Sequence, residues 1–421
     1  MNLFGGVIPI TGITFLMFSI FAIIAVGFAL GRITIKGISL GDAGVFLIAL
    51  VFGCIFYDVL DSQLTVKLGL VTVSYTSNAL KIIENLGLIL FVTSVGFIAG
   101  PKFFGNFKKN FKSYVVLALV VILAGGLTAV GCIFFGKTVM GAENIEELTA
   151  MMVGILAGAL TSTPAFSASK EAVGEALEST VATGYGIAYI FGVIGVVLFV
   201  QLVPKMLRAD MNVEREKLLA ASASAEKNET KKKTGKLFEI DGHGFAAFAL
   251  AAIIGMFIGM IKIPLTSAGL SGTCFSLTTT GGCLLTSLVF GHFANIGPVS
   301  IMPKDSTLKI FKELGLILFL AGAGVAGGAK FIDLFKPEYF FYGMIITIMP
   351  MIIGFFFAKY VLKLNLLNNL GSLTGAMTST PALGTLIGVS KTDDVASAYA
   401  ATYPIALIAV VLVSQLIVIL F

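Results

Sequence analysis

The stretch that decides the fold is "GALTSTPAF", residues 158–166, which recurs as "GAMTSTPAL" at residues 375–383. Each copy places three hydroxyl side chains and a proline inside a sequence that is otherwise strongly apolar. Proline removes a backbone hydrogen-bond donor and clashes with the preceding helical turn, so it leaves carbonyl groups without partners. Lipid cannot satisfy those carbonyl groups, and we therefore expect both breaks to face protein or a wet cavity.

The composition excludes a water-soluble globule and indicates a polytopic membrane protein. Of the 421 residues, 57% are hydrophobic and 12% are charged, and the mean hydropathy is +1.00. A soluble domain carries about 25% charged residues. Ten apolar runs predict membrane helices: residues 10–30, 44–59, 86–100, 113–135, 180–203, 245–261, 282–297, 313–328, 339–358 and 396–421. Runs of this length fit helices rather than the strands of a barrel.

An internal repeat organises the chain into two halves. "LGLILFVTSVGFIAGPKFF" at residues 86–104 reappears as "LGLILFLAGAGVAGGAKFI" 228 positions later, and the hydroxyl motif reappears 217 positions later. Repeats of this length indicate a duplicated membrane module. We therefore predict three segments: a first membrane repeat at 1–203, a basic linker at 204–241, and a second membrane repeat at 242–421.

The distribution of lysine and arginine predicts the topology, because cytoplasmic loops carry the excess of positive charge. The linker and residues 101–112 are rich in lysine, whereas residues 137–148 are acidic. The linker lies on the cytoplasmic side only if the segment with the first motif enters the membrane from outside and returns to the outside as a re-entrant hairpin. Each half then has five spanning helices and one hairpin, the halves are inverted, and both termini lie outside. An additional short helix at 164–178 also gives an odd number of crossings in the first half. A single broken span gives an even number and would place the linker outside.

The hydroxyl motifs are the candidate substrate site. Thr161, Ser162 and Thr163 can cap a helix that restarts at Pro164, and the positive N-terminal end of that helix suits a carboxylate. The full candidate set is Gly158, Thr161, Ser162, Thr163, Pro164 and Tyr189 in the first half, and Gly375, Thr378, Ser379, Thr380, Pro381 and Tyr403 in the second. The alternative is a proline kink whose hydroxyls bond back to the backbone. Duplication in both halves favours the binding site.

Ionisable residues are expected near helix ends. Asp58, Glu84 and Glu313 lie close to the ends of apolar runs, which argues against a proton pump built on buried carboxylates. Lys81, Lys102, Lys309 and Lys330 flank apolar runs, and we expect them to reach the lipid headgroups.

The sequence predicts neither a metal site nor enzymatic chemistry. Cysteines stand at positions 54, 132, 274 and 283 without a Cys-x-x-Cys pair, and the two histidines are far apart. No His-Glu-x-x-His motif, pair of intramembrane aspartates or Ser-His arrangement is present. We expect no cofactor, with Na⁺ as the one candidate coupling ion.

The doubled Gly-Ala-x-Thr-Ser-Thr-Pro-Ala motif, together with the doubled Leu-Gly-Leu-x-Leu-Phe and Gly-x-x-x-Gly helix, resembles the aspartate:alanine exchanger family of bacterial transporters. The resemblance covers both membrane halves. It implies a fold related to cation/proton antiporters, an elevator motion and a homodimer. Many members carry soluble regulatory domains in the central region, whereas this chain has about 38 residues there, too few for such a domain.

The resemblance implies exchange or export of acidic amino acids such as aspartate, or of C4 and C5 dicarboxylates, across the bacterial inner membrane. A Na⁺-coupled glutamate-type symporter of related fold and an ion channel are the alternatives. The expected partners are a small anionic solute, the lipid bilayer and a second copy of the chain, and no nucleic acid.

Overall fold

The protein is an all-helical polytopic membrane protein. A computed structural model describes residues 2–3, 8–35, 38–39, 41, 43–68, 71–105, 111–141, 143–223, 240–264, 274–392 and 394–421. In the first half the helices are α1 (Gly12–Arg32), α2 (Ala43–Gln63), α3 (Thr76–Gly105), α4 (Phe111–Thr138), α5 (Ile145–Ala159), α6 (Thr163–Val173) and α7 (Glu178–Met206). In the second half they are α9 (Phe245–Gly259), α10 (Thr278–Phe293), α11 (Asp305–Gly328), α12 (Phe331–Leu334), α13 (Pro337–Phe356), α14 (Leu366–Ala376), α15 (Thr380–Ser390) and α16 (Val395–Leu420).

Each of the ten apolar runs contains a helix in the structure, but these helices differ in length. Among the described residues, eight helices are long and apolar enough to cross a membrane: α1, α2, α3, α4, α7, α11, α13 and α16. The other two, α9 and α10, have 15 and 16 residues, which is shorter than the roughly 20 residues that a bilayer requires.

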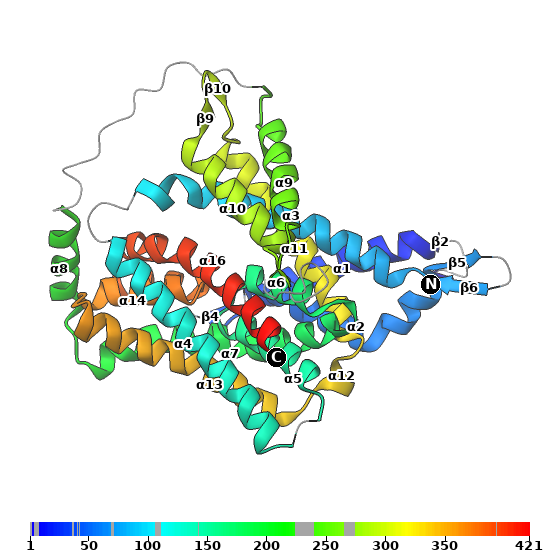
Figure 1. The fold of residues 1–421 in the computed structure, drawn as a ribbon, viewed down its shortest axis with the longest axis horizontal. Coiled ribbons are helices and arrows are strands. Elements are labelled where there is room, and N and C mark those ends of the chain that lie inside the picture. The colour runs from blue at the N-terminus through cyan, green and yellow to red at the C-terminus, as the bar shows by residue number, and fades with distance from the viewer. Residues whose placement is uncertain are drawn as a thin grey trace.

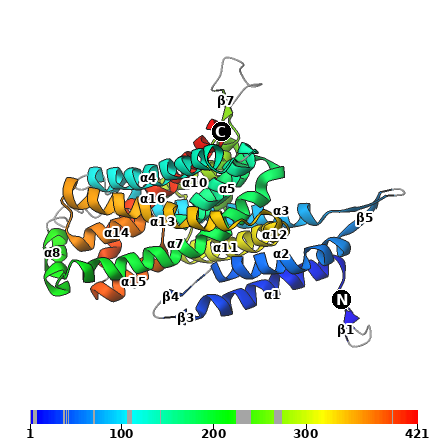
Figure 2. The same cartoon turned by 90° about the horizontal axis from the view of Figure 1, so that it is seen from below.

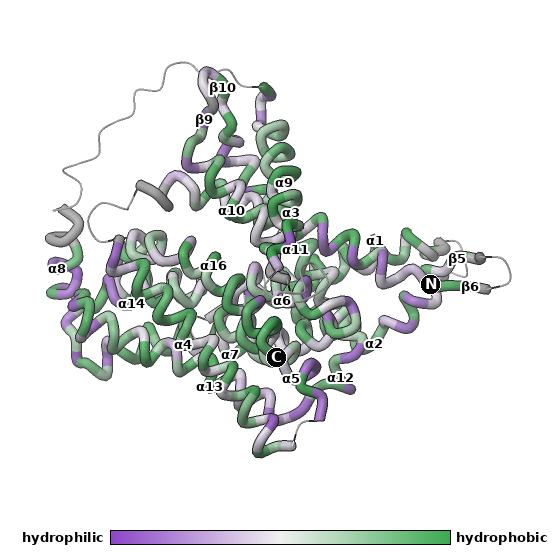
Figure 3. Tube along the Cα trace, viewed as in Figure 1, coloured by the Kyte–Doolittle hydropathy of each residue, from purple (hydrophilic) through white to green (hydrophobic). Residues whose placement is uncertain are grey.

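Apolar side chains cover the outside of the molecule. Phe21 is 68% exposed, Leu127 70% and Phe257 70%. A soluble protein does not present so much exposed apolar surface, and this surface therefore belongs against lipid. The hydrophilic stretches gather at α8 (Met211–Ala223) and around α12 and the start of α5 (Figure 3).

The helices form two bundles. In the first, here called the scaffold bundle, α3 packs against α10 and α11, α11 also packs against α2, and the pairs α1–α2 and α9–α10 complete it. In the second, the hairpin bundle, α5 packs against α7, α14 against α16, and α4 and α13 lie against both pairs. Figure 1 shows α9 and α10 on one side of the molecule and α4, α13 and α14 on the other.

The helices of the two halves follow one another in the same order. Helices α1 to α7 have counterparts in α9, α10, α11, α13, α14, α15 and α16. The equivalent helices α3 and α11 cross at Gly87 and Gly315. A Cβ at Gly87 would meet the backbone of Phe319, and a Cβ at Gly315 would meet the backbone of Phe91. The helices are antiparallel here, because Gly322 lies beside Glu84.

The connection between the halves contains α8, and residues 224–239 lie outside the described part of the chain. Helix α8 contacts the second half at two points: Arg215 Nε donates to the carbonyl of Ser390 (3.1 Å), and Glu214 Oε2 accepts from the backbone N–H of Leu366 (3.3 Å). The predicted linker thus includes a helix that touches both ends of the α14–α15 segment.

Short antiparallel ribbons decorate the helix ends. They pair β1 (Asn2–Leu3) with β2 (Ile8–Pro9), β3 (Thr34–Ile35) with β4 (Ile38–Ser39), β5 (Thr65–Leu68) with β6 (Val71–Ser74), β7 (Ile263–Pro264) with β8 (Cys274–Phe275), and β9 (Asn295–Ile296) with β10 (Val299–Ser300). The β5–β6 ribbon and α8 lie at opposite ends of the molecule in both views (Figures 1 and 2).

Candidate functional site

The first hydroxyl motif forms the tip of a helical hairpin, here called the first hairpin (Ile145–Val173). Helix α5 begins at Asn144, whose side chain accepts a hydrogen bond from Glu147 N, and it ends at Ala159. Helix α6 begins after Ser162, whose hydroxyl accepts from Ala165 N at 3.3 Å, with proline in its first turn. The predicted cap therefore belongs to Ser162, and Thr163 is already helical.

The contacts of α7 establish that the chain returns at this tip. Gly154 of α5 lies against Val181, and Gly158 lies against Tyr185, so α5 and α7 run in the same direction. In α6 the order is reversed: the Phe166 ring stacks on the ring of Tyr185 at 4.1 Å between centroids, whereas Lys170 reaches Glu178. Helix α6 therefore runs back towards the end from which α5 starts.

The second motif has the same construction. In the second hairpin (Leu366–Ser390), the side chain of Asn365 caps α14 by accepting from Asn368 N. Gly371 lies against Val395 and Gly375 against Tyr399, so α14 and α16 run in the same direction. Only residues 391–394 separate α15 from α16, which requires α15 to return as α6 does.

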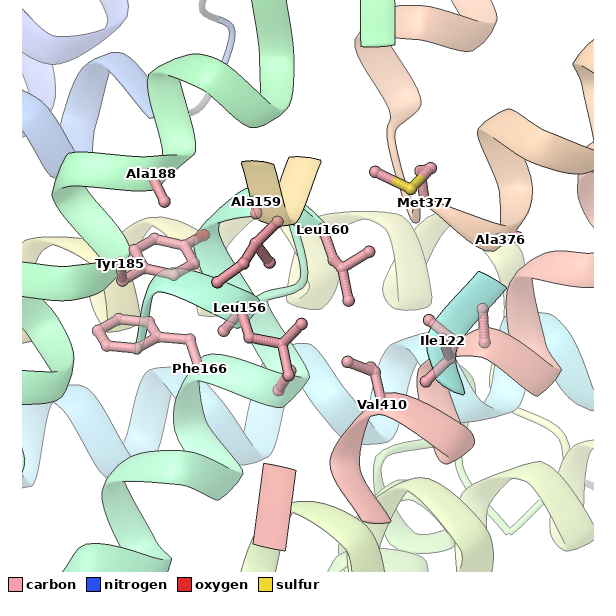
Figure 4. Close-up of a cluster of buried hydrophobic side chains, with 14 of the residues drawn as sticks. Ile122, Leu156, Ala159, Leu160, Phe166, Tyr185, Ala188, Ala376, Met377 and Val410 are labelled. Atoms are coloured by element: carbon pink, nitrogen blue, oxygen red, sulfur yellow. The ribbon is translucent and has the colours of Figure 1, made fainter. Parts of the chain in front are cut away.

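The two tips contact each other. Thr161 Oγ1 donates to the carbonyl of Met377 at 3.2 Å, and Thr378 Oγ1 donates to the carbonyl of Leu160 at 2.7 Å. Leu160 and Met377 both belong to a cluster of buried hydrophobic side chains (Figure 4). Both threonines have φ of 51°. A β-branched residue rarely adopts this left-handed conformation, and such strain often marks a functional position.

A cavity of about 330 Å³ lies at the tips. Eight of the twelve candidate residues line it: Thr161, Ser162, Thr163, Pro164, Tyr189, Thr378, Pro381 and Tyr403. The remaining four stand elsewhere. Gly158 and Gly375 pack against the backbones of α7 and α16, Ser379 is fully buried with no hydrogen-bond partner for its hydroxyl among the described residues, and Thr380 begins α15 but its side chain is outside the described part.

The cavity contains one charged residue that the sequence reasoning missed. Lys312 of α11 is half-buried, and it is the single charged residue among the described lining residues. No ion pair or hydrogen bond involves its ammonium group within the described residues. Its position is equivalent to Glu84 of α3 at the 228-residue spacing. That exchange of charge between the two copies was the available signal.

On the other face of the tips, ion pairs connect the two bundles. Lys170 of α6 binds Glu84 of α3 at 2.6 Å, and Lys81 of α3 binds Glu175 at 2.8 Å and Glu178 at 3.1 Å. Glu84 is 7% exposed and Lys170 4%. Glu84, which the sequence places near the end of an apolar run, is thus buried within the protein, where Lys170 satisfies its charge.

Hydroxyl groups reinforce the same contact. Thr280 Oγ1 of α10 lies 2.9 Å from Ser167 Oγ and donates to Glu171 Oε1 at 3.0 Å. A second cavity of about 740 Å³ borders this cluster, with Lys81, Glu84 and Glu171 in its lining. The first hairpin is therefore docked onto the scaffold bundle through α6, whereas α15 of the second hairpin packs against α7 and α16.

The described residues contain no group of three His, Cys, Asp or Glu side chains that could hold a metal ion. The polar groups that converge at the tips are hydroxyls, backbone N–H groups at the starts of α6 and α15, and one ammonium. The backbone N–H groups and the ammonium can donate to an anionic oxygen, whereas the hydroxyls of Thr161 and Thr378 already donate to carbonyls of the opposite tip.

Comparison with known proteins gives consistent matches. A family model described as "Predicted Permease Membrane Region" of the Asp-Al_Ex type matches residues 19–205 and 247–419. An uncharacterized transporter of Bacteroides fragilis is 26% identical, with 95% of this chain and 97% of the relative aligned. A putative transport protein of Pectobacterium atrosepticum is 23% identical over 96% of this chain and 98% of its own length.

The alignment with the Bacteroides fragilis relative runs over 553 positions, although this chain has 421 residues. The relative therefore contains segments that have no counterpart here. The two family matches flank residues 206–246, the region in which the described part of this chain contains α8. The prediction of the membrane part without soluble domains is confirmed.

Proposed function

The chain belongs to the Asp-Al exchanger family of membrane permeases, and from that premise we propose that it carries a small organic anion across the bacterial inner membrane by alternating access. The anion is an acidic amino acid such as aspartate or a C4 or C5 dicarboxylate. The observation that carries this proposal is the cavity at the two tips, because it combines hydroxyls, two helix starts and Lys312.

The proposed architecture is a pair of inverted repeats. It is supported by the equal order of helices in the two halves and by the reciprocal contacts of Gly87 with Gly315 and of Thr161 with Thr378. Because α3 and α11 are antiparallel at their crossing, a two-fold axis between them runs perpendicular to both helices. An axis in the plane of the membrane is typical of secondary transporters, which bind substrate at the repeat interface.

The proposed topology follows from the returning hairpins. With two returning hairpins, each half crosses the membrane an odd number of times, so the basic connection with α8 lies in the cytoplasm and both termini outside. The second hairpin lies beside α8 (Figure 2) and hence enters from the cytoplasmic side. The first hairpin enters from the outside.

Transport then requires the hairpin bundle to move against the scaffold bundle. In the present state α6 is docked onto α3 and α10, which in this proposal closes the outer side, while the cavity with Lys312 is lined by both tips. The opposite state docks α15 onto α11 and frees α6. This exchange of roles between the two hairpins is the elevator motion that we propose.

Reconstitution of the purified protein in liposomes tests the function. We expect uptake of labelled aspartate or succinate to be driven by internal unlabelled substrate. A dependence on an imposed Na⁺ gradient would favour the symporter instead, with Na⁺ bound by hydroxyls and carbonyls at the tips. Currents far above transporter turnover would favour a channel. No flux of either anion, by folded protein with or without Na⁺, would refute the proposal.

A further inference from the structure

The two copies of the crossing helix carry opposite charges at one equivalent position. Helices α3 and α11 pack symmetrically at Gly87 and Gly315, yet three residues earlier α3 has Glu84 and α11 has Lys312. Glu84 is buried in an ion pair, whereas Lys312 lines the cavity at the tips. The symmetry of the backbone is therefore broken in the charges that flank the substrate site.

The partner of Glu84 is not duplicated either. Lys170 of α6 neutralises Glu84 at 2.6 Å in the docked first hairpin. At the 217-residue spacing of the motifs, Lys170 corresponds to Ile387 of α15. Helices α6 and α15 have matching bounds, Thr163–Val173 and Thr380–Ser390, so this equivalence holds along their whole length.

This asymmetry has a consequence when the second hairpin docks onto α11 as the first now docks onto α3. Lys312 would then take the place that Glu84 has today, and it would face the apolar side chain of Ile387. A buried ammonium without a partner is strongly unfavourable. The state in which the second hairpin is docked onto α11 thus lacks a negative charge that would neutralise Lys312.

We propose that Lys312 couples closure of the second hairpin to a bound anion, and that Ile387 enforces this coupling by withholding an internal partner. The inference rests on the proposed function. The substrate carboxylate supplies the missing charge, so the loaded protein closes readily and the empty protein does not. A substrate with two carboxylates fits best, since one can bind at the tips while the other pairs with Lys312.

The coupling has a kinetic signature in liposomes. Exchange requires only loaded transitions, whereas net efflux into substrate-free buffer requires the empty protein to return. The wild-type protein is expected to exchange labelled succinate rapidly and to release it slowly without external succinate. The ratio of the two rates measures the barrier that the unpaired Lys312 imposes.

Supplying an internal carboxylate removes the barrier. Ile387→Glu at pH 7.5 places a negative charge where α15 meets Lys312, and we expect net efflux to rise about tenfold, within the range of typical coupling factors. Ile387→Gln is the matched control, because it has a similar shape without the charge. The double variant Ile387→Glu with Lys312→Met leaves the new carboxylate unpaired, so the gain in net efflux is expected to disappear.

The possible results distinguish the transport function from the charge coupling. A wild-type protein that moves neither succinate nor aspartate refutes the transport function itself. A wild-type protein that exchanges them, together with equal net efflux for Ile387→Glu and Ile387→Gln, overturns the charge coupling alone. Lys309→Met, one turn earlier on the exposed side of α11, controls for general effects of removing a lysine there, and each variant is first checked for a monodisperse, folded state.

Discussion

Thr161 and Thr378, 217 positions apart in the chain, each donate a hydroxyl hydrogen bond to the carbonyl that precedes the other. Both residues have φ of 51°, a conformation that costs about 1–3 kcal/mol in a residue of this kind. The reciprocal bonds offset part of that cost. Each hairpin tip therefore depends on the other to keep its conformation. The contact therefore fixes the position of the cavity at the tips.

Valine substitution tests this contact. Thr161→Val and Thr378→Val keep the branched shape but remove the donor, which leaves a buried carbonyl without its partner. We expect each to lower the free energy of unfolding by about 1–3 kcal/mol and to reduce uptake. The effects of the double variant are expected to be non-additive, because both bonds hold the same junction.

Thr128→Val is the matched control for the tip variants. Its hydroxyl bonds to the carbonyl of Ala124 in its own helix at 2.7 Å, so its removal leaves the tips intact. Thermal unfolding in detergent and uptake in liposomes are the two measurements. Wild-type stability in both tip variants would contradict a structural role of the reciprocal bonds.

The sequence was sufficient to predict the helices, the position of the hairpin tips and the close helix crossings. The Gly-x-x-x-Gly pair Gly96 and Gly100 does pack against α10, as Gly324 and Gly328 do against α2. Such features repeat in the sequence, and a duplicated pattern identifies them. The choice between a hairpin and a broken span depended on parity alone until the contacts with α7 gave the direction of α6.

The positions of the charged side chains in the structure could not be predicted from the repeated pattern. The apolar run of the third helix starts at residue 86, but α3 begins at Thr76, so Glu84 lies two turns inside the helix rather than at its end. Lys170 lies four residues beyond the end of the motif, yet its role depends on a partner 86 positions away. Pairing across bundles is a tertiary property, and no local pattern encodes it.

The crossing of α3 and α11 gives a second prediction. Gly87→Ala and Gly315→Ala each place a methyl group against backbone atoms of the facing helix. We expect a loss of about 1–3 kcal/mol of stability for each, because the helices must separate. Gly131→Ala is the control, since nothing lies within 4 Å of a Cβ there, and alanine stabilises a helix relative to glycine. A melting temperature for Gly87→Ala at or above that of Gly131→Ala would be inconsistent with the crossing.

The pair Lys170 and Glu84 gives a third prediction. Lys170→Met leaves the Glu84 carboxylate buried without its ion-pair partner, and we expect a cost of about 3–5 kcal/mol. Glu84→Leu is expected to cost less, because Lys170 keeps Glu178 at 3.7 Å. The double variant Glu84→Leu with Lys170→Met removes both charges and is expected to recover most of that loss. Thermal unfolding with a double-mutant cycle measures the coupling. If the double variant is as unstable as the single variants combined, the two residues do not act as a pair.

The start of α9 provides a pH-dependent prediction outside the membrane helices. The carboxylate of Asp241 accepts hydrogen bonds from the backbone N–H groups of Ala246, Phe245, His243 and Gly244, and these bonds lower its pKa to about 2. The pKa of an unperturbed aspartate is about 3.9. A group whose pKa is lower in the folded state stabilises the fold above the unfolded pKa, and this contribution is lost as pH falls through the folded pKa.

Asp241→Asn removes the charge while keeping the shape of the side chain. We expect the variant to melt below the wild type at pH 5 to 8, with a constant difference in melting temperature over that interval. Below about pH 4 the difference should shrink, because the wild-type carboxylate begins to be protonated in the unfolded state and then in the folded state. Melting curves of both proteins at half-unit steps from pH 8 to pH 3 give the comparison. A difference that is absent at pH 7, or that widens on acidification, would show that Asp241 does not hold the start of α9 through its charge.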